Sequence, residues 1–165
     1  MKTPSHLVLL ITLTLAWLTT GCGFHLRGSY DLPPSASPLY IETRSIDLSE
    51  HLRLILATSG VRLVEKPAAA RLILRIIEEQ WDTRTLSVDS RGKVVESELH
   101  YRVDFDVVSP SGETHIERQS VDMVRALHNP DVEVLGKRQE EALLRSDMER
   151  DMANRIVYRL RAQLR

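Results

Sequence analysis

Residues 99–107 read LHYRVDFDV, and apolar side chains alternate with polar or charged ones along the whole stretch. A period of two is typical of a β-strand with one face buried and the other exposed. The apolar set is Leu99, Tyr101, Val103, Phe105 and Val107. Because only one side of this strand is apolar, the pattern predicts an antiparallel sheet that is covered on one face only.

The neighbouring segments extend the same sheet in both directions. Residues 71–88 form a long stretch rich in β-branched residues, and the turn sequence SRGK at 90–93 connects it to the central strand. The sequence SPSG at 109–112 predicts the next turn, followed by a third long strand over 113–125. Its alternation slips after Arg118, which predicts a β-bulge there. Shorter strands are expected at 39–43 and 61–64, with a loop over 65–70.

Two segments have helical periodicity. Asp47 is expected to begin a helix, with Glu50 as its capping-box partner and Gly60 at its end. The apolar face of this helix consists of Leu48, Leu52, Ile55 and Leu56. After a loop over 127–136, the last helix is expected over 137–164, with an apolar stripe of Leu144, Met148, Met152, Ile156, Leu160 and Leu164.

These elements predict the α+β class: two helices packed on one face of a mainly antiparallel, roughly four-stranded sheet. The chain has 165 residues, and 42% of them are hydrophobic. That length fits one domain, which we place at 39–165. Residues 22–38 contain the Pro- and Ser-rich sequence SYDLPPSASP and are expected to form a leash.

The first residues have the pattern of a signal peptide. Lys2 precedes the uncharged run LVLLITLTLAWL at 7–18, which is shorter than the about 20 apolar residues that a spanning helix needs. The sequence TTGC at 19–22 resembles the lipobox of bacterial lipoprotein precursors, although Thr19 stands where the commonest lipobox has leucine. The resemblance implies removal of residues 1–21 and lipid attachment at Cys22. An ordinary secretory signal followed by an unmodified cysteine is the alternative. By resemblance to Gram-negative lipoproteins, in which aspartate after the cysteine favours retention in the inner membrane, Gly23 implies sorting to the outer membrane, facing the periplasm.

Several classes of chemistry lack support in the sequence. The formal net charge of −1 argues against binding nucleic acid. The single cysteine excludes an intramolecular disulfide and a thiolate zinc cluster. His100 and His115 could face each other across a hairpin, but exposed strand histidines are the more common case. Asp104 and Asp106 share a strand face that we expect to be solvated. The sequence therefore predicts no enzyme, no cofactor and no metal site.

Residues 22–28, CGFHLRG, resemble the mature N-terminus of the LPS-assembly lipoprotein LptE family. The Pro33-Pro34 leash, the helix end at 59–61, the Arg91-Gly92 turn and the Asn129-Pro130 loop also fit the order of that family. The resemblance implies a lipid-anchored plug within the β-barrel LptD, in a one-to-one complex that assembles lipopolysaccharide at the outer membrane surface. It also implies help in assembling the barrel and direct binding of lipopolysaccharide.

Two pairs of basic residues could contact the phosphates of lipopolysaccharide. Arg91 and Lys93 flank the glycine of the first turn, and Lys137 and Arg138 stand where the last helix is expected to begin. Both cations and helix N-termini bind phosphate. The alternative is that both pairs only solubilise the surface or contact the barrel. For the whole chain, the alternatives are an auxiliary lipoprotein of another envelope lipid transporter and, less favoured, a periplasmic hydrolase.

Overall fold

The computed structural model describes residues 32–128 and 134–164, with the backbone alone for residues 128 and 134–138. Its elements, in chain order, are η2 (Pro34–Ala36), β1 (Leu39–Glu42), α2 (Ile46–Thr58), η3 (Pro67–Ala69), β2 (Leu72–Val88), β3 (Val94–Val108), β4 (Thr114–His128) and α3 (Val134–Gln163). Among the described residues, no helix combines the length and the apolar character that crossing a bilayer requires.

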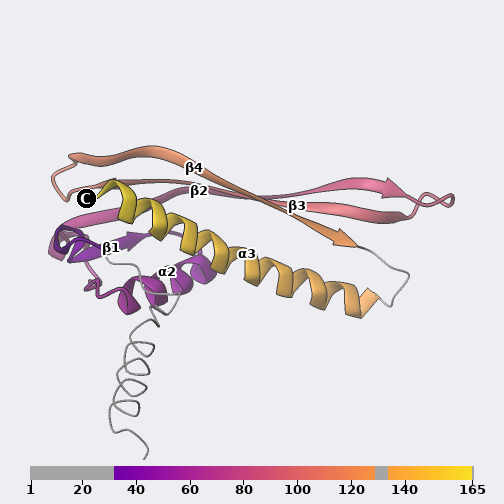
Figure 1. Cartoon of the computed structure of the whole chain (residues 1–165), viewed down its shortest axis with the longest axis horizontal. Coiled ribbons are helices and arrows are strands. Elements are labelled where there is room, and N and C mark those ends of the chain that lie inside the picture. Colours follow the sequence, from indigo (N-terminus) through magenta and orange to yellow (C-terminus); the bar gives the residue numbers. More distant parts are fainter. Residues whose placement is uncertain (1–31, 129–133, 165) are drawn as a thin grey trace, which may run out of the picture.

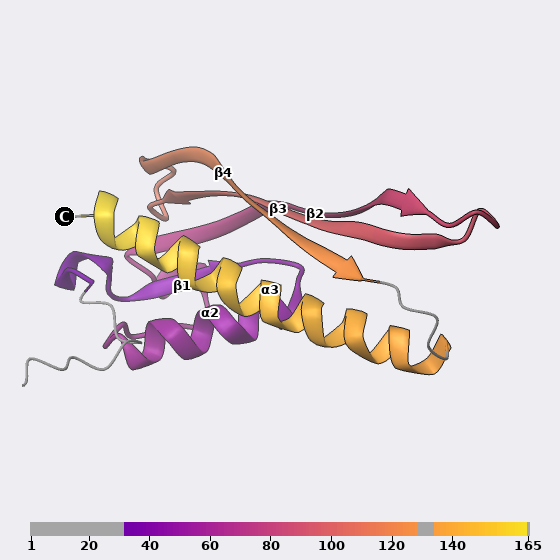
Figure 2. The same cartoon turned by 45° about the vertical axis from the view of Figure 1, so that its right-hand side comes forward.

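The four strands form one sheet in the order β1-β2-β3-β4. β1 is parallel to β2, whereas β2, β3 and β4 form an antiparallel meander. Both helices lie against the same face of this sheet, and the opposite face carries no helix of the described chain (Figures 1 and 2). The predicted fold class is therefore confirmed.

The central strand and the two helical stripes build the core, as their patterns predict. Tyr101, Val103, Phe105 and Val107 of β3 are at most 1% exposed. They pack against buried side chains of both helices, namely Leu48, Leu52 and Leu56 of α2 and Met148, Met152, Ile156 and Leu160 of α3. Short β1 adds Leu39 and Ile41 to the same core.

Two β-bulges change which way side chains point. Phe105 pairs with Gln119 and Val107 pairs with Ile116, so an extra residue of β4 lies at Glu117–Arg118. This confirms the bulge that the slipped alternation predicts. A second bulge lies in β2 between Ile76 and Glu78, and it leaves Ile77 42% exposed.

Several predicted boundaries are wrong. The first helix begins at Ile46 with Ser45 as N-cap, and no side chain caps it, so the capping box of Asp47 and Glu50 does not form. Asp47 instead lies in the first turn, where a negative charge favours the helix dipole. Residues 61–64 form only an isolated bridge between Leu63 and Leu39, because the Val61 N–H donates to the Leu56 carbonyl and closes the helix.

The two remaining differences lie in the loops. The predicted loop 65–70 contains the short helix η3. The loop before the last helix is shorter than expected, because β4 continues to His128 and α3 begins at Val134. Pairing with β3, which continues to Glu96 and His128, extends β4 beyond what its own alternation predicts.

Polar groups interrupt the core where β2, β3 and the helices meet. The Tyr101 hydroxyl donates to Glu79 Oε1 at 2.8 Å, and the Tyr101 ring stacks on Trp81 with a centroid distance of 3.8 Å. The Arg145 guanidinium lies 4.9 Å from the centre of the Trp81 ring. Burial raises the pKa of the Glu149 carboxyl, and the negative charges of Asp47 and Glu79 raise it further, against the opposing effect of Arg145.

We predict that Leu52→Ala lowers the free energy of unfolding by about 2–5 kcal/mol, because the side chain is fully buried and its removal leaves a cavity. The matched control is Leu54→Ala on the same helix, where the side chain is 64% exposed and the expected change is within about 0.5 kcal/mol. Urea denaturation followed by circular dichroism measures both. Equal effects for the two variants would contradict the packing of α2 described above.

We also predict that Glu149→Gln stabilises the protein at pH 7 by about 0.5 kcal/mol, since solvent screens part of the repulsion that it removes. A carboxyl whose pKa is raised on folding destabilises the folded state when it is ionised. The benefit of the substitution should therefore shrink as the pH falls through the raised pKa of Glu149 toward the ordinary glutamate value of 4.5, and it should be lost below that value. Thermal unfolding at pH 4 and pH 7 tests this, with exposed Glu140→Gln as the control. A gain that does not change with pH would refute the electrostatic cause.

Candidate ligand and partner surfaces

The turn between β2 and β3 is a tightly bonded loop that presents two cations. Asp89 Oδ1 accepts the backbone N–H groups of Arg91 at 2.8 Å and Lys93 at 2.9 Å. The Asp89 N–H donates to the Lys93 carbonyl, and the Gly92 N–H donates to the Asp89 carbonyl. Gly92 has φ of 79°, a conformation that glycine adopts without a steric penalty. The turn therefore holds both basic residues on a fixed backbone.

Arg91 and Lys93 share one carboxylate. The Arg91 guanidinium pairs with Asp89 Oδ2 at 3.0 Å, and the Arg91 side chain is 71% exposed. The pKa of Asp89 lies below its ordinary value, mainly because of the hydrogen bond from the Lys93 backbone, with further contributions from Arg91. Asp89 thus stays ionised near neutral pH, and the tip carries an excess of one positive charge.

Lys137 and Arg138 follow Val134, the first residue of α3, and do not themselves begin the helix. The helix begins at Val134, so its unpaired backbone N–H groups belong mainly to residues 134–137. The side chains of both residues lie outside those that the structure describes. The start of α3 and the β2–β3 turn lie at the same end of the molecule, opposite the end that holds η2 (Figures 1 and 2).

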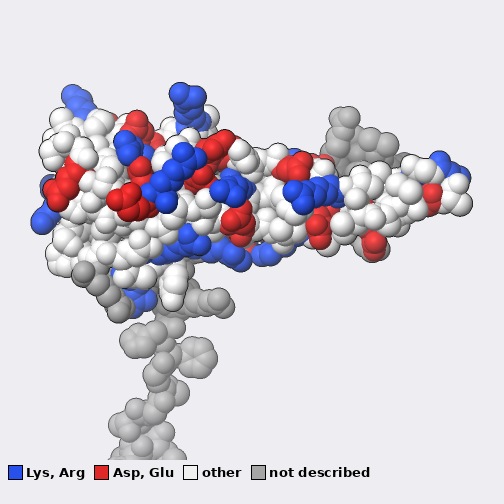
Figure 3. All heavy atoms as spheres, turned by 90° about the horizontal axis from the view of Figure 1, so that it is seen from above, with Lys and Arg blue, Asp and Glu red and all other residues white. Residues whose placement is uncertain are grey.

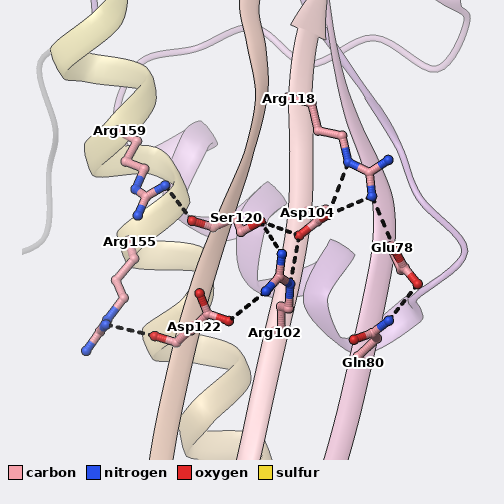
Figure 4. A network of polar contacts seen from close by, with 9 residues as sticks. All are labelled: Glu78, Gln80, Arg102, Asp104, Arg118, Ser120, Asp122, Arg155 and Arg159. Atoms are coloured by element: carbon pink, nitrogen blue, oxygen red, sulfur yellow. Dashed lines mark hydrogen bonds and ion pairs between the residues drawn. The ribbon is translucent and has the colours of Figure 1, made fainter.

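The face of the sheet that carries no helix is lined by charged side chains of the strands themselves (Figure 4). Asp104 lies at the centre of a network and is 6% exposed. Its carboxylate accepts the Ser120 hydroxyl at 2.7 Å, Arg118 Nη2 at 2.6 Å and Arg102 Nε at 3.2 Å. Arg118 of β4 also reaches across β3 to Glu78 of β2, at 3.2 Å. The network therefore connects β2, β3 and β4.

Asp106, two residues farther along β3 and on the same face, is also paired with an arginine. Arg75 Nε donates to Asp106 Oδ1 at 2.7 Å, and its Nη2 bonds the second oxygen, so the pair is bidentate. Asp106 is 7% exposed. The expectation that Asp104 and Asp106 form a solvated face is wrong, because arginine side chains lie over them and exclude water. The Ser120 hydroxyl, Arg118 and Arg102 lower the pKa of Asp104, which is unlike the raised value of a general acid.

The two histidines of interest are not brought together. His100 pairs across the sheet with Val124, and its Nε2 lies 3.1 Å from Glu98 Oε2. His115 lies at the opposite end of the β3–β4 hairpin, beside Ile116, whose partner is Val107. Within the described ranges, no group of three histidine, cysteine or acidic residues is placed to hold a metal ion.

Viewed from the side of this uncovered face, the surface mixes both signs of charge along the sheet (Figure 3). Arginines and carboxylates alternate there, in agreement with the pairs described above. The network around Asp104 is not predicted from the sequence alone. The signal was present in the alternating polar residues of 100–106, but reading it requires the register with β2 and β4. Cys22 and the signal peptide lie outside the described residues.

Comparisons with known proteins give a consistent result. A family model described as "LptE: Lipopolysaccharide-assembly" matches residues 36–160. The LPS-assembly lipoprotein LptE of Photorhabdus laumondii is 32% identical over 94% of this chain and 86% of its own length. The protein of the same name from Yersinia enterocolitica is 31% identical over 94% of this chain and 76% of its own length.

Two solved structures share the fold. An uncharacterized lipoprotein B from Nitrosomonas europaea superposes with a TM-score of 0.70 and 28% identity, covering 85% of this chain and 91% of its own. The rare lipoprotein B from Shewanella oneidensis gives a TM-score of 0.64 and 28% identity, covering 74% and 92%. Since the family match extends from η2 almost to the end of α3, the chain belongs to the LptE family of LPS-assembly lipoproteins.

Proposed function

We propose that this protein is the lipid-anchored partner of the outer-membrane β-barrel LptD, that it acts as plug and assembly factor in a one-to-one complex, and that it binds lipopolysaccharide. The observation that carries the proposal is the family match over residues 36–160. As a member of that family, the chain is a non-enzymatic envelope lipoprotein involved in lipopolysaccharide assembly. The barrel partner, the ligand contacts and the outer-membrane location are the parts that we propose.

The surface of the domain supports a position inside a barrel. The lumen of a transmembrane barrel is polar, so a protein that fills it needs a polar surface. The sheet supplies one in which cations and carboxylates are already paired, as in Arg75–Asp106 and Arg118–Asp104. Such a face satisfies its own charges and needs no matching charge on the barrel wall at each position. It can therefore lie against a hydrated wall without leaving unpaired charge.

We propose Cys22 as the site of lipid attachment, with the residues that follow it as the leash. The described chain begins at Leu32, close to η2, at the end of the molecule opposite the β2–β3 turn (Figure 2). The turn is thus the part of the domain that extends farthest from the point where the leash joins. This arrangement supports a role in which the anchored end stays near the inner leaflet and the turn reaches away from it.

We propose the turn as a contact for the lipid A phosphates. Arg91 is exposed, and its planar guanidinium suits bidentate bonding to phosphate. Asp89 orients the guanidinium and neutralises part of its charge, so an arriving phosphate must compete with that carboxylate. Lys137 and Arg138 remain a second proposed contact at the same end of the domain.

We predict that the tagged chain co-purifies with LptD from outer membranes at a one-to-one ratio, measured by quantitative mass spectrometry. Depletion of the chain should reduce correctly assembled LptD and admit large hydrophobic antibiotics.

Cys22→Ala should abolish lipid labelling and leave uncleaved or mislocalised precursor. Co-purification with an inner-membrane transporter, with LptD assembly intact after depletion, would support the auxiliary-transporter alternative instead.

We predict that the double variant Arg91→Glu/Lys93→Glu weakens lipopolysaccharide binding about tenfold at low salt and less at high salt, because salt screens exposed charges. Lys137→Glu/Arg138→Glu should have a smaller effect, because the N–H groups at the start of α3 still attract anions. Titration of the purified full chain with lipopolysaccharide measures both.

The matched control for charge is Arg62→Glu/Lys66→Glu, which makes the same change at the opposite end of the domain. All variants should keep the circular dichroism spectrum and the thermal midpoint of the parent. If Arg91→Glu/Lys93→Glu and the control Arg62→Glu/Lys66→Glu reduced binding equally, the effect would be one of net charge and the turn would not be the site. Unchanged binding by the folded Arg91/Lys93 variant would contradict the proposal directly.

A further inference from the structure

The outer edge of β2 is uncovered over most of its length. β2 has 17 residues and β1 has 4, and their pairing ends at Glu42 and Arg75. Beyond Arg75, β3 is the one strand of the described sheet that pairs with β2. A strand with a single neighbour directs half of its backbone N–H and C=O groups away from the sheet. These groups are available to another strand.

The uncovered edge contains a long regular segment. Bulges lie between Ile76 and Glu78 and again after Thr85, but from Glu78 to Thr85 every residue pairs with β3 in unbroken register. At roughly 3.3 Å per residue, this segment is about 26 Å long. Residues 82–86 are exposed on both faces of the sheet. An added strand would therefore meet no covering element there.

At the opposite edge of the sheet, side chains of α3 form hydrogen bonds with the backbone of β4. Arg159 Nη1 donates to the Ser120 carbonyl at 2.7 Å, and Arg155 Nη1 donates to the Asp122 carbonyl at 3.4 Å (Figure 4). These two carbonyls are two residues apart and point in the same direction, away from β3. Side chains of α3 thus occupy two backbone carbonyls near the middle of the β4 edge. Along Ile76–Thr85, the described residues supply no comparable side-chain donor to the backbone.

A hollow of about 980 Å³ adjoins the start of the free edge, where β1 ends. Its walls include apolar Ile76, Ile77 and Trp81, and the carboxylates of Glu42, Glu78 and Glu79. Arg44 and Arg75 also line it, but Arg75 is bound to Asp106 and Glu78 is bound to Arg118. Glu42 and Glu79 then remain against Arg44. The charge that remains in the hollow is negative, and the apolar side chains offer contacts for a branched side chain.

From this edge and this hollow, we propose that β2 accepts an extended segment of a partner protein as a fifth strand, along Glu78–Thr85, and that the segment alternates apolar and basic residues. Backbone hydrogen bonds to the free edge provide affinity, as in other cases of β-strand addition. Basic side chains of the segment face Glu78 and Asp82, and apolar ones pack on the Trp81 side. The inference does not depend on the proposed complex with LptD.

The test uses the full lipidated chain in detergent and a fluorescent ten-residue peptide of alternating lysine and valine. We expect saturable binding and slower hydrogen exchange in residues 76–85, with exchange in β4 unchanged. A copy of the peptide with alternate backbone nitrogens methylated should not bind, because it cannot complete the strand ladder. This copy separates strand addition from simple attraction between charges.

Glu78→Lys/Asp82→Lys should weaken peptide binding about tenfold, since it places like charges opposite each other across the new strand pair. The matched control, Glu113→Lys/Glu117→Lys near the β4 edge, should change binding by less than about twofold. Asp82→Lys alone serves as a second variant, because Asp82 pairs with exposed Arg84 and lies outside the Asp104 network.

Four results would overturn the proposal: no binding, protection outside residues 76–85, equal binding of the methylated peptide, or equal loss in the control variant. A fifth is a dimer that protects residues 76–85 without peptide, because the occupant of the edge would then be a second copy of this chain. Failure of any of these arms leaves the LptD proposal intact, since co-purification of the barrel is measured separately.

Discussion

Burial of one face of β3 against the two helices is the interaction on which the other features depend. Val103, Phe105 and Val107 have no measurable exposure, and helices α2 and α3 both pack on that side of the sheet. Each fully buried side chain of this size contributes about 1.5–3 kcal/mol relative to an exposed one. A one-residue shift of register would turn every one of these side chains to the other face. The apolar face therefore sets the register, and the register decides which charged residues meet on the opposite face.

The charged face follows from that register. Asp104 and Asp106 alternate with the core residues of β3, so fixing the core also fixes the two carboxylates beside Arg118 and Arg75. Removing water from a carboxylate is costly unless it is paired and hydrogen-bonded, and both are. The long arginine stems cover the strands while their charged groups stay at the surface. A sheet face without helices is thus protected by side chains of the sheet itself, and it presents paired charge to whatever lies against it.

The sequence predicted those features that depend on local periodicity and failed where a feature depends on contacts between distant segments. The alternation in 99–107, the apolar stripe of α3 and the bulge near Arg118 are all visible within a short window, and all are confirmed. The predicted start of α2 at Asp47 was wrong, because the helix begins at Ile46. Its N-cap is Ser45, whose side chain makes no capping hydrogen bond, so the sequence carries no capping signal at that position. The buried state of Asp104 could not be predicted, because its partners Arg118 and Ser120 come from another strand. Contact of Lys137 and Arg138 with lipopolysaccharide and lipid attachment at Cys22 stay predictions.

The two ends of the domain differ in stability for a physical reason. Near η2, β1 and the ends of both helices, the sheet is covered and the core is dense. Toward the β2–β3 turn, residues 82–86 are exposed on both faces, so backbone hydrogen bonds to β3 hold the strand there with little apolar burial. Segments of that kind open at a lower free-energy cost than the core does. Opening there leaves the covered end of the domain intact, so the hairpin can adjust to a ligand or an added strand without unfolding the end that contains η2 and β1. Cations at the turn and a free strand edge behind it are therefore compatible with one stable domain.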